Sequence, residues 1–251
     1  ERLAETVETI HQAGARAYLA LNTVVFEPEL AQIETVIRAA AAAGVDALLV
    51  QDPAVALLAQ RVAPGLVLHA STQMTISSPE AAVFARDLGA ARAVLPRELS
   101  VDEIAAFVHG TSLEAEVFVH GALCVAWSGQ CLTSEAWGGR SANRGECAQS
   151  CRMPYELVLD GERRDLGDVR YLLSPKDLAG ARAVPRLVAL GVRGLKIEGR
   201  QKGAPYVATA VQGYRRWLDA VAGGEAGSRA AQRQLQQDLL AMTLAFSRGF
   251  G

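Results

Sequence analysis

The sequence predicts an α/β protein built as a TIM-like (β/α) barrel, and three features indicate this fold. Four segments repeat one pattern, in which a glycine between small or apolar residues precedes a short apolar run. These runs show no polar alternation, as expected for parallel strands that are buried on both faces. They are separated by helical stretches and recur at intervals of roughly 20 to 30 residues, which is typical of βα units.

The expected strands can be placed in order along the chain. The repeated segments are AGARAYLALN from Ala13, AGVDALLVQD from Ala43, LGAARAVLPRE from Leu88 and LGVRGLKIEGR from Leu190. Each contains a glycine that suits the position after a helix C-terminus, where a left-handed backbone conformation costs glycine little. These glycines are Gly14, Gly44, Gly89 and Gly191. GLVLHAST from Gly65 and AEVFVHGA from Ala115 bring the expected strands to six.

Helix start signals lie between these runs. Ser78 and Pro79 read as an N-cap and the first helical residue, and Ser100 with Glu103 reads as a capping box. A closed barrel needs eight strands, so we expect the first two βα units to be missing from a chain that begins at Glu1 rather than at Met. An open doubly wound sheet is the alternative, but no glycine-rich dinucleotide turn follows any strand.

Two domains are expected from this reading. Residues 1–222 would form the truncated barrel, with a cysteine-containing insertion at 121–155 after the sixth visible strand. Residues 223–251 would form a C-terminal helical segment that leads into a further region.

Composition limits the class of protein. Half of the residues are hydrophobic and the net charge is −2, a profile typical of globular proteins. No apolar run approaches the ~18 residues of a membrane span and no secretion signal opens the chain, so we expect a cytoplasmic protein with no membrane partner. The near-neutral charge gives no global argument for a nucleic-acid partner.

Polar residues gather where the expected strands end, which in a barrel is the rim that holds the active site. Alternation along the last strand places Lys196, Glu198 and Arg200 on one side. Two histidines, His69 and His120, lie at other strand ends and can bind a substrate oxygen or move a proton near neutral pH. Asn22 and Gln73 complete the polar rim.

The chemistry of the chain is concentrated in one window. All four cysteines, spaced C-x6-C-x15-C-x3-C, lie within HGALCVAWSGQCLTSEAWGGRSANRGECAQSCRMPY; they are Cys124, Cys131, Cys147 and Cys151. Disulfides are disfavoured because nothing marks the chain as secreted. A structural zinc site is possible, although zinc modules usually pair cysteines more closely. An iron–sulfur cluster also takes four thiolates and tolerates varied spacing.

The same window and the blocks around it resemble a known family. EVFVHGALCVAWSGQCLTS, from Glu116 to Ser134, is similar to the signature of the collagenase-like peptidases of unknown catalytic type. GGRSANRGECAQSCRMPYEL, YLLSPKDL and LKIEGRQKGAPYVATAVQGYRRWLD resemble the family's following blocks, in the same order. The resemblance covers roughly residues 1–222, and the closing AFSRGFG is similar to the family's F-x-R-G-F element.

The resemblance implies a function as well as a TIM-like barrel. Despite the peptidase name, relatives include oxygen-independent hydroxylation proteins that act on tRNA, on ribosomal RNA and in ubiquinone biosynthesis. Some of them hold a 4Fe-4S cluster, and the RNA-modifying ones use prephenate. The wording of GGRSANRGECAQSCRMPY and LLSPKDL is closest to the large-subunit ribosomal RNA cytidine hydroxylase branch. The resemblance therefore implies RNA base hydroxylation, with RNA and a small carboxylate as partners.

One departure from the family concerns the cluster ligands. Many relatives have K-D-L-C where this chain has Lys176-Asp177-Leu178-Ala179, and that late cysteine can be a ligand. The resemblance implies Cys124, Cys131 and Cys147 as ligands here, with Cys151 or a non-protein ligand as the fourth.

The remaining predictions concern substrate. Arg140, Arg144 and Arg152 lie in the cysteine window and suit phosphate or a dicarboxylate such as prephenate, although they can equally balance thiolate charge. Lys196, Glu198 and His69 are the candidate catalytic residues; Arg200, Gln73 and His120 join the three arginines as candidate substrate-binding residues.

Two other functions stay open. A peptidase would fit the family name, but the chain has no H-E-x-x-H motif and no nucleophile elbow. A non-catalytic RNA-binding or assembly module with a structural metal is the other alternative. The oligomeric state does not follow from the sequence.

Overall fold

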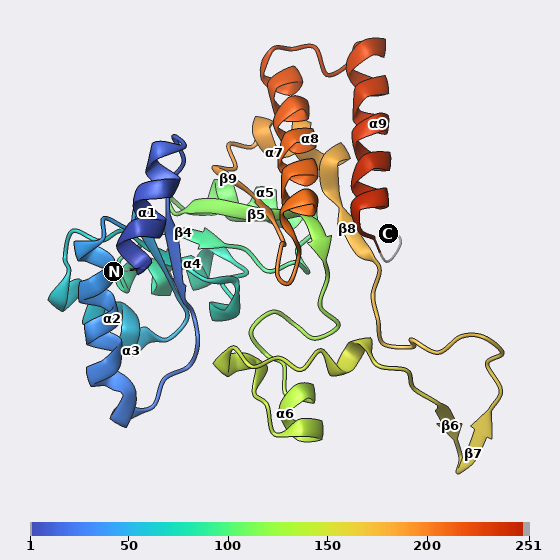
Figure 1. Ribbon diagram of the computed structural model, residues 1–251, viewed down its shortest axis with the longest axis horizontal. Coiled ribbons are helices and arrows are strands. Elements are labelled where there is room, and N and C mark those ends of the chain that lie inside the picture. The colour runs from blue at the N-terminus through green and yellow to red at the C-terminus, as the bar shows by residue number, and fades with distance from the viewer. Residues whose placement is uncertain (1, 248–251) are drawn as a thin grey trace. The chain divides into compact units, whose positions relative to one another are not determined.

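The structure is a computed structural model that describes residues 2–247 (Figure 1). The chain divides into two compact units. Unit 1 comprises residues 2–119 and 182–196, and unit 2 comprises residues 120–181 and 197–247. The domain limits expected from the sequence are not tested by this division and stay predictions. Most of the expected F-x-R-G-F element lies outside the described residues.

Unit 1 is an alternation of strands and helices, as the repeated pattern predicts. Its elements are α1 (Arg2–Gln12), β1 (Tyr18–Leu21), α2 (Leu30–Ala42), β2 (Ala47–Val50), α3 (Pro53–Val62), β3 (Leu68–Ala70), α4 (Pro79–Asp87), β4 (Ala90–Val94), α5 (Val101–Gly110), most of β5 (Glu114–Ala122), α7 (Val184–Ala189) and β9 (Gly194–Ile197). The strands β1 to β5 pair in chain order and in parallel, and β9 pairs with β5.

This arrangement confirms an α/β fold with a parallel sheet, consistent with a TIM-like barrel. All six expected strands are present, at the expected places. The two missing units stay a prediction. One detail is corrected: the cysteine window follows β5, which is the fifth strand, because the sixth expected strand, β9, comes later in the chain.

Local signals explain where the helices of unit 1 begin and end. The Ser78 hydroxyl accepts a hydrogen bond from the amide of Ala81 at the start of α4. Ser100 and Glu103 form the predicted capping box at the start of α5. The four predicted glycines have φ angles of 73° to 83°, which confirms the left-handed turns between helix and strand.

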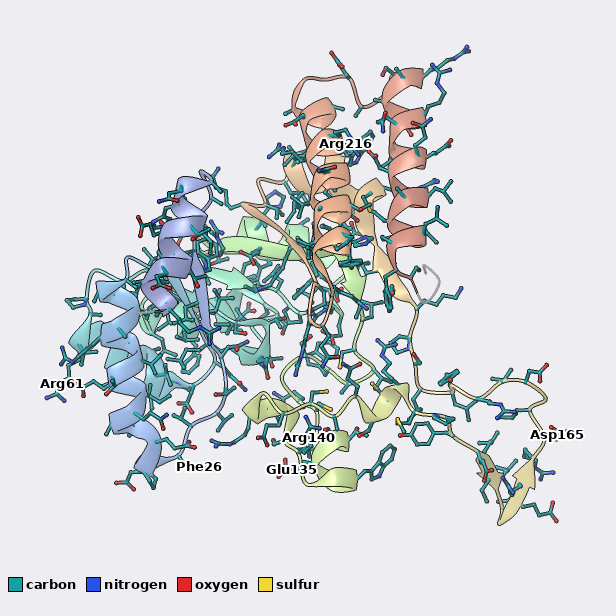
Figure 2. All side chains as sticks on the ribbon, in the orientation of Figure 1. Phe26, Arg61, Glu135, Arg140, Asp165 and Arg216 are labelled. Atoms are coloured by element: carbon teal, nitrogen blue, oxygen red, sulfur yellow. The ribbon has the colours of Figure 1, made fainter. Side chains whose placement is uncertain are left out.

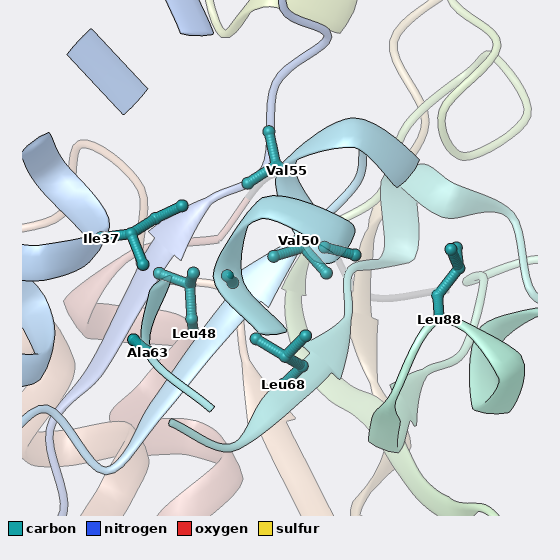
Figure 3. Close-up of a cluster of buried hydrophobic side chains, with 9 residues drawn as sticks. Ile37, Leu48, Val50, Val55, Ala63, Leu68 and Leu88 are labelled. Atoms are coloured by element: carbon teal, nitrogen blue, oxygen red, sulfur yellow. The ribbon is translucent and has the colours of Figure 1, made fainter. Parts of the chain in front are cut away.

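The core of unit 1 lies between the helices and one face of the sheet (Figure 3). Ile37 of α2 and Val55 of α3 pack against Leu48 and Val50 of β2 and Leu68 of β3. Because neighbouring strand residues face opposite ways, Leu49 and His69 point to the other face of the sheet. The sequence thus reserves one face for packing and leaves the other for polar side chains.

Unit 2 begins within β5. Residues His120–Ala122 of β5 pair in antiparallel fashion with β8 (Asp177–Ala179), so that His120 lies opposite Ala179. The helices α8 (Ala204–Ala222) and α9 (Arg229–Ala245) pack side by side, and a Cβ at Gly213 would meet the Met242 side chain at 2.2 Å. The unit also contains α6 (Thr133–Gly138) and a hairpin of β6 (Leu157–Leu159) and β7 (Glu162–Arg164). Among the described helices, none is long and apolar enough to cross a membrane.

The core of unit 1 leads to a stability prediction. Leu48 is fully buried, so Leu48→Ala should lower the free energy of unfolding by about 2–5 kcal/mol, since the neighbours cannot fill the cavity. Leu57→Ala removes the same atoms from a side chain that is 55% exposed and should change stability by less than about 0.5 kcal/mol. Chemical denaturation of both variants would measure the difference. Equal losses would show that Leu48 is not in the core.

Candidate functional site

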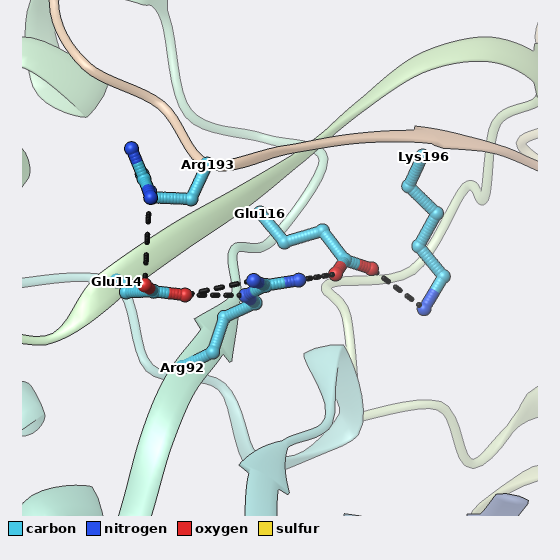
Figure 4. Close-up of polar contacts among 5 residues, drawn as sticks. All are labelled: Arg92, Glu114, Glu116, Arg193 and Lys196. Carbon is cyan, nitrogen blue, oxygen red and sulfur yellow. Dashed lines mark hydrogen bonds and ion pairs between the residues drawn. The ribbon is translucent and has the colours of Figure 1, made fainter. Parts of the chain in front are cut away.

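A chain of charged side chains lies on the polar face of the unit 1 sheet (Figure 4). Arg92 of β4 donates to Glu114 at 2.7 and 3.0 Å and to Glu116 at 3.3 Å. Lys196 of β9 lies 3.4 Å from the other oxygen of Glu116, and Arg193 lies 3.6 Å from Glu114. Lys196 was predicted as a catalytic residue; its partners Arg92 and Glu116 were not.

The geometry of the sheet creates this cluster. Arg92 is the register partner of both Glu114 and His69, so the three side chains share one face on neighbouring strands. Glu116 follows Glu114 by two residues and therefore faces the same way. A Cβ at Gly194 would approach the Glu116 side chain to 2.8 Å, so the absence of a side chain there makes room for the carboxylate.

The cluster is costly to bury unless its charges are paired. The Arg92 and Glu116 side chains are 13% and 11% exposed. Buried ion pairs recover their desolvation cost only when further hydrogen bonds satisfy the charged groups. Arg92 meets this condition because its guanidinium donates to both Glu114 and Glu116. Hydrogen bonds from Arg92 hold the pKa of Glu114 below its usual value. Lys196 is 28% exposed, so its ammonium remains within reach of a bound molecule.

His69 lies beside this cluster on β3 and is only 4% exposed. Burial lowers its pKa, and the charge of Arg92 lowers it further, so the imidazole is neutral at pH 7. The Tyr18 ring meets it edge-on at 5.1 Å, and its Nδ1 has no partner among the described residues. A neutral imidazole can accept or donate a proton, as the predicted catalytic role requires.

The predicted polar rim forms a hydrogen-bonded layer at the ends of β1 to β3. The Asn22 amide donates to the Ser71 hydroxyl at 3.0 Å, and the Gln73 amide donates to the Asn22 carbonyl at 3.1 Å. The Gln51 side-chain oxygen is buried without a partner among the described residues. These bonds give Gln73 a structural contact; its substrate-binding role stays a prediction.

The cysteine window lies in unit 2, and none of its four cysteines forms a disulfide within residues 2–247. Burial raises the pKa of the Cys151 thiol; Arg152 lowers it, and Cys147 and Cys131 raise it further. Among the described residues, no group of three or more His, Cys, Asp or Glu side chains is arranged to hold a metal ion. Four thiols are nevertheless the donor type that zinc and iron–sulfur centres use, so metal binding by these cysteines stays a prediction.

The turn between two of these cysteines is held from outside the window. Gln149 has a φ of 57°, rare for a residue with a side chain, and its amide N–H donates to the Cys147 sulfur at 3.4 Å. The Gln149 side chain donates to Gln201, which is also left-handed, at 2.9 Å. Arg200 donates to the Gly145 carbonyl at 3.3 Å, and its own amide donates to Glu198 at 3.0 Å. The loop after β9 therefore holds the segment around Cys147.

The arginines of the window differ in their surroundings. Arg152 donates to the Ser174 hydroxyl at 2.6 Å, to the Pro175 carbonyl at 2.7 Å and to the Leu123 carbonyl. This guanidinium links the start of the window to the segment before β8. Arg140 is exposed (Figure 2), and Arg144 is half-buried. Substrate binding by the three arginines stays a prediction, and Arg152 already has a structural role.

His120 lies in an aromatic environment. It is 1% exposed, and burial lowers its pKa while Asp177 raises it. The Tyr214 hydroxyl lies 3.4 Å from its Nδ1, and the Tyr206 ring is 6.0 Å away. Both tyrosines belong to α8, more than 80 residues further along the chain, so the sequence around His120 does not predict these contacts. A role of His120 in substrate binding is not tested by this geometry.

These features define a class of protein: a βα-repeat protein with a polar sheet face and an insertion that carries four cysteines. The chain matches the model of Peptidase family U32 over residues 1–250, so it belongs to this family. Its relatives include both RNA hydroxylation proteins and proteins named as peptidases.

Three relatives show the range of the family. The 23S rRNA 5-hydroxycytidine C2501 synthase of Escherichia coli (strain K12) is 44% identical over 219 residues, 87% of this chain and 33% of that protein. The tRNA hydroxylation protein P1 of Bacillus subtilis (strain 168) is 38% identical over 88% of this chain and 53% of that protein. A collagenase of Porphyromonas gingivalis (strain ATCC BAA-308 / W83) is 34% identical over 100% of this chain and 62% of that protein. The chain thus spans between a third and about three fifths of the length of these relatives.

The buried histidines lead to a prediction about pH. His69 and His120 both have folded-state pKa values below the ordinary 6.5, so the unfolded chain binds more protons and stability falls as pH drops through about 6.5. His69→Leu should reduce this slope by up to about 1.4 kcal/mol per pH unit. Denaturation between pH 5.5 and 7.5, about a unit either side of that value, measures the slope. An unchanged slope in the variant would show that His69 is not held neutral.

Proposed function

We propose that this chain is part of an enzyme that hydroxylates a base of ribosomal RNA or tRNA by an oxygen-independent, iron–sulfur and prephenate-linked reaction in the cytoplasm. The observation that supports it most is the 44% identity with a 23S rRNA 5-hydroxycytidine synthase over 87% of this chain. The tRNA hydroxylation protein matches across a similar share. Ribosomal RNA is the favoured substrate because the highest of these identities is with the ribosomal RNA enzyme.

The proposed cofactor is a 4Fe-4S cluster bound by the four cysteines. The Gln149 amide donates to the Cys147 sulfur, as amides around such clusters do. We propose Cys151 as the fourth ligand beside Cys124, Cys131 and Cys147, although the described side chains are not arranged as a metal-binding group. When bound, the cluster would supply one-electron chemistry. A zinc ion would instead make the window a structural element.

The protein residues have separate proposed roles. Lys196 presents a partly exposed ammonium that can hold a developing oxygen charge, while Glu116 keeps it in place. His69, held neutral, can take or give a proton at a ring nitrogen. In unit 2, the exposed Arg140 suits the carboxylates of prephenate or an RNA phosphate.

A peptidase is the second candidate, because a relative named collagenase is 34% identical over the whole chain. The residues give it less support. The sequence has neither an H-E-x-x-H motif nor a nucleophile elbow. Gelatin cleavage that a Lys196→Met substitution abolishes, in protein freed of other proteases, would favour this candidate.

Metal analysis tests the proposed cofactor. Protein purified without oxygen should contain about four iron and four sulfide per chain. Cys147→Ser and Cys151→Ser should each remove most of both, whereas Met153→Leu, a change at an exposed neighbour, should not. One zinc without sulfide would exclude the redox role. Full cluster content in Cys151→Ser alone would show that another ligand is the fourth.

Analysis of modified nucleosides tests the reaction. Loss of the gene should remove one hydroxylated base from ribosomal RNA or tRNA, as measured by mass spectrometry of digested RNA. Complementation with the wild-type gene should restore it and Lys196→Met should restore less than about a hundredth, because the charge opposite Glu116 is lost. Lys176→Met alters an exposed lysine and should restore it fully. RNA unchanged by loss of the gene would overturn the proposal.

A further inference from the structure

The hairpin of unit 2 encloses a groove that none of the roles above uses. The residues just before β6, the end of β7 and the loop that continues to Arg170 line a volume of about 880 Å³. Arg163, Arg164 and Arg170 line it, together with the ring of Tyr155. Figure 2 marks its outer loop at Asp165. Apart from Pro154 and Tyr155, its lining follows the cysteine window in the chain, and it includes none of the predicted site residues.

The arginines of the groove are available for an anionic ligand. Arg163 pairs with Glu156, and both side chains are about two thirds exposed. Arg164 lies 3.7 Å from Glu162, also at the surface, and Arg170 makes no ion pair within residues 2–247. Exposed pairs of this kind contribute little stability, so a phosphate can replace their carboxylates. Asp165, the other carboxylate of the lining, accepts a hydrogen bond from the Gly167 amide in its own turn.

Aromatic and apolar side chains lie next to these charges. The Tyr155 ring lies next to Trp137 with the ring centres 5.2 Å apart and the planes tilted by 48°. Trp137 is 59% exposed, and Tyr155 is half-buried. All three residues of β6 (Leu157, Val158 and Leu159) are exposed, although they are apolar. A two-stranded hairpin without a covering layer is only marginally stable in water. Its composition therefore suits a ligand that brings both flat apolar surface and negative charge.

We propose that this groove binds a single-stranded segment of the RNA substrate, outside the site of reaction. This inference rests on the proposed function. Arginine forks match phosphate oxygens, and exposed tryptophan and tyrosine rings stack on unpaired bases. The lining holds three arginines and two carboxylates, so its net charge is weakly positive. We therefore expect the groove to add to the affinity for an RNA that also binds elsewhere on the enzyme. An acidic polypeptide would also pair with the arginines, but it would offer no flat ring to the exposed Trp137.

Salt-dependent binding of a labelled single-stranded RNA fragment tests the proposal in the whole chain. The double variant Arg163→Gln and Arg170→Gln removes two phosphate contacts, so the slope of log affinity against log salt should fall by about 1.4. Arg38→Gln with Arg215→Gln removes two exposed arginines elsewhere and should leave the slope unchanged. Trp137→Leu should weaken binding by roughly 5- to 100-fold, the loss expected for one stacked base. The same RNA in duplex form should bind more weakly, and its affinity should not change in Trp137→Leu.

The outcomes separate this inference from the proposed function. Unchanged slope and affinity in the groove variants, with melting temperatures equal to the wild type, would overturn the inference. Groove variants that no longer bind an acidic polypeptide but still bind RNA with wild-type affinity would assign the surface to a protein partner. That result would also overturn the inference. In another outcome, the wild type binds RNA but modifies no base, while the groove variants bind RNA less tightly. That result would overturn the proposed reaction and keep the groove as an RNA site. Reduced modification by the groove variants at low RNA concentration, restored at high concentration, would support both.

Discussion

A buried guanidinium between two carboxylates organises the polar face of the unit 1 sheet. Arg92 is held by Glu114 and Glu116, and Glu116 in turn orients Lys196. If Glu116 were missing, Lys196 would lose this carboxylate partner and Arg92 would keep only Glu114; removing one partner from a buried ion-pair network is among the more costly defects in a folded protein. The chain keeps this arrangement on the face of the sheet opposite the helices, where it adds nothing to the apolar core. Its cost is understandable if these charges serve a substrate.

Local signals predicted most of the unit 1 fold. Strand positions, the Ser100 and Glu103 capping box and the left-handed glycines each depend on a few neighbouring residues, and the structure has them where the sequence places them. The six apolar runs are short and unalternating, as expected for buried parallel strands, and every residue of β2 is buried. The place of the cysteine window was miscounted: it follows the fifth expected strand, and the sixth, β9, comes later in the chain.

The partners of the site residues could not be predicted in the same way. Arg92 meets Glu114 only because two strands align at one register, and a shift of one residue would turn the side chains to opposite faces. Tyr206 and Tyr214 reach His120 from α8, and Gln201 reaches Gln149 from the loop after β9. Each contact joins residues that lie far apart in the chain. A charged residue in an otherwise apolar strand, such as Glu116, is the one signal that was available.

The proposed fourth cluster ligand, Cys151, and the position it would replace, Ala179, lie in different kinds of local structure. Ala179 lies in β8 directly opposite His120, so a cysteine at this position would be fixed by the strand pairing. Cys151 instead lies in a short helical turn next to Arg152, whose guanidinium holds three groups from the segments around it. That anchoring supplies by side-chain contacts the rigidity that a strand would supply by pairing. A thiol held in this way is the one that we propose in place of a cysteine at position 179.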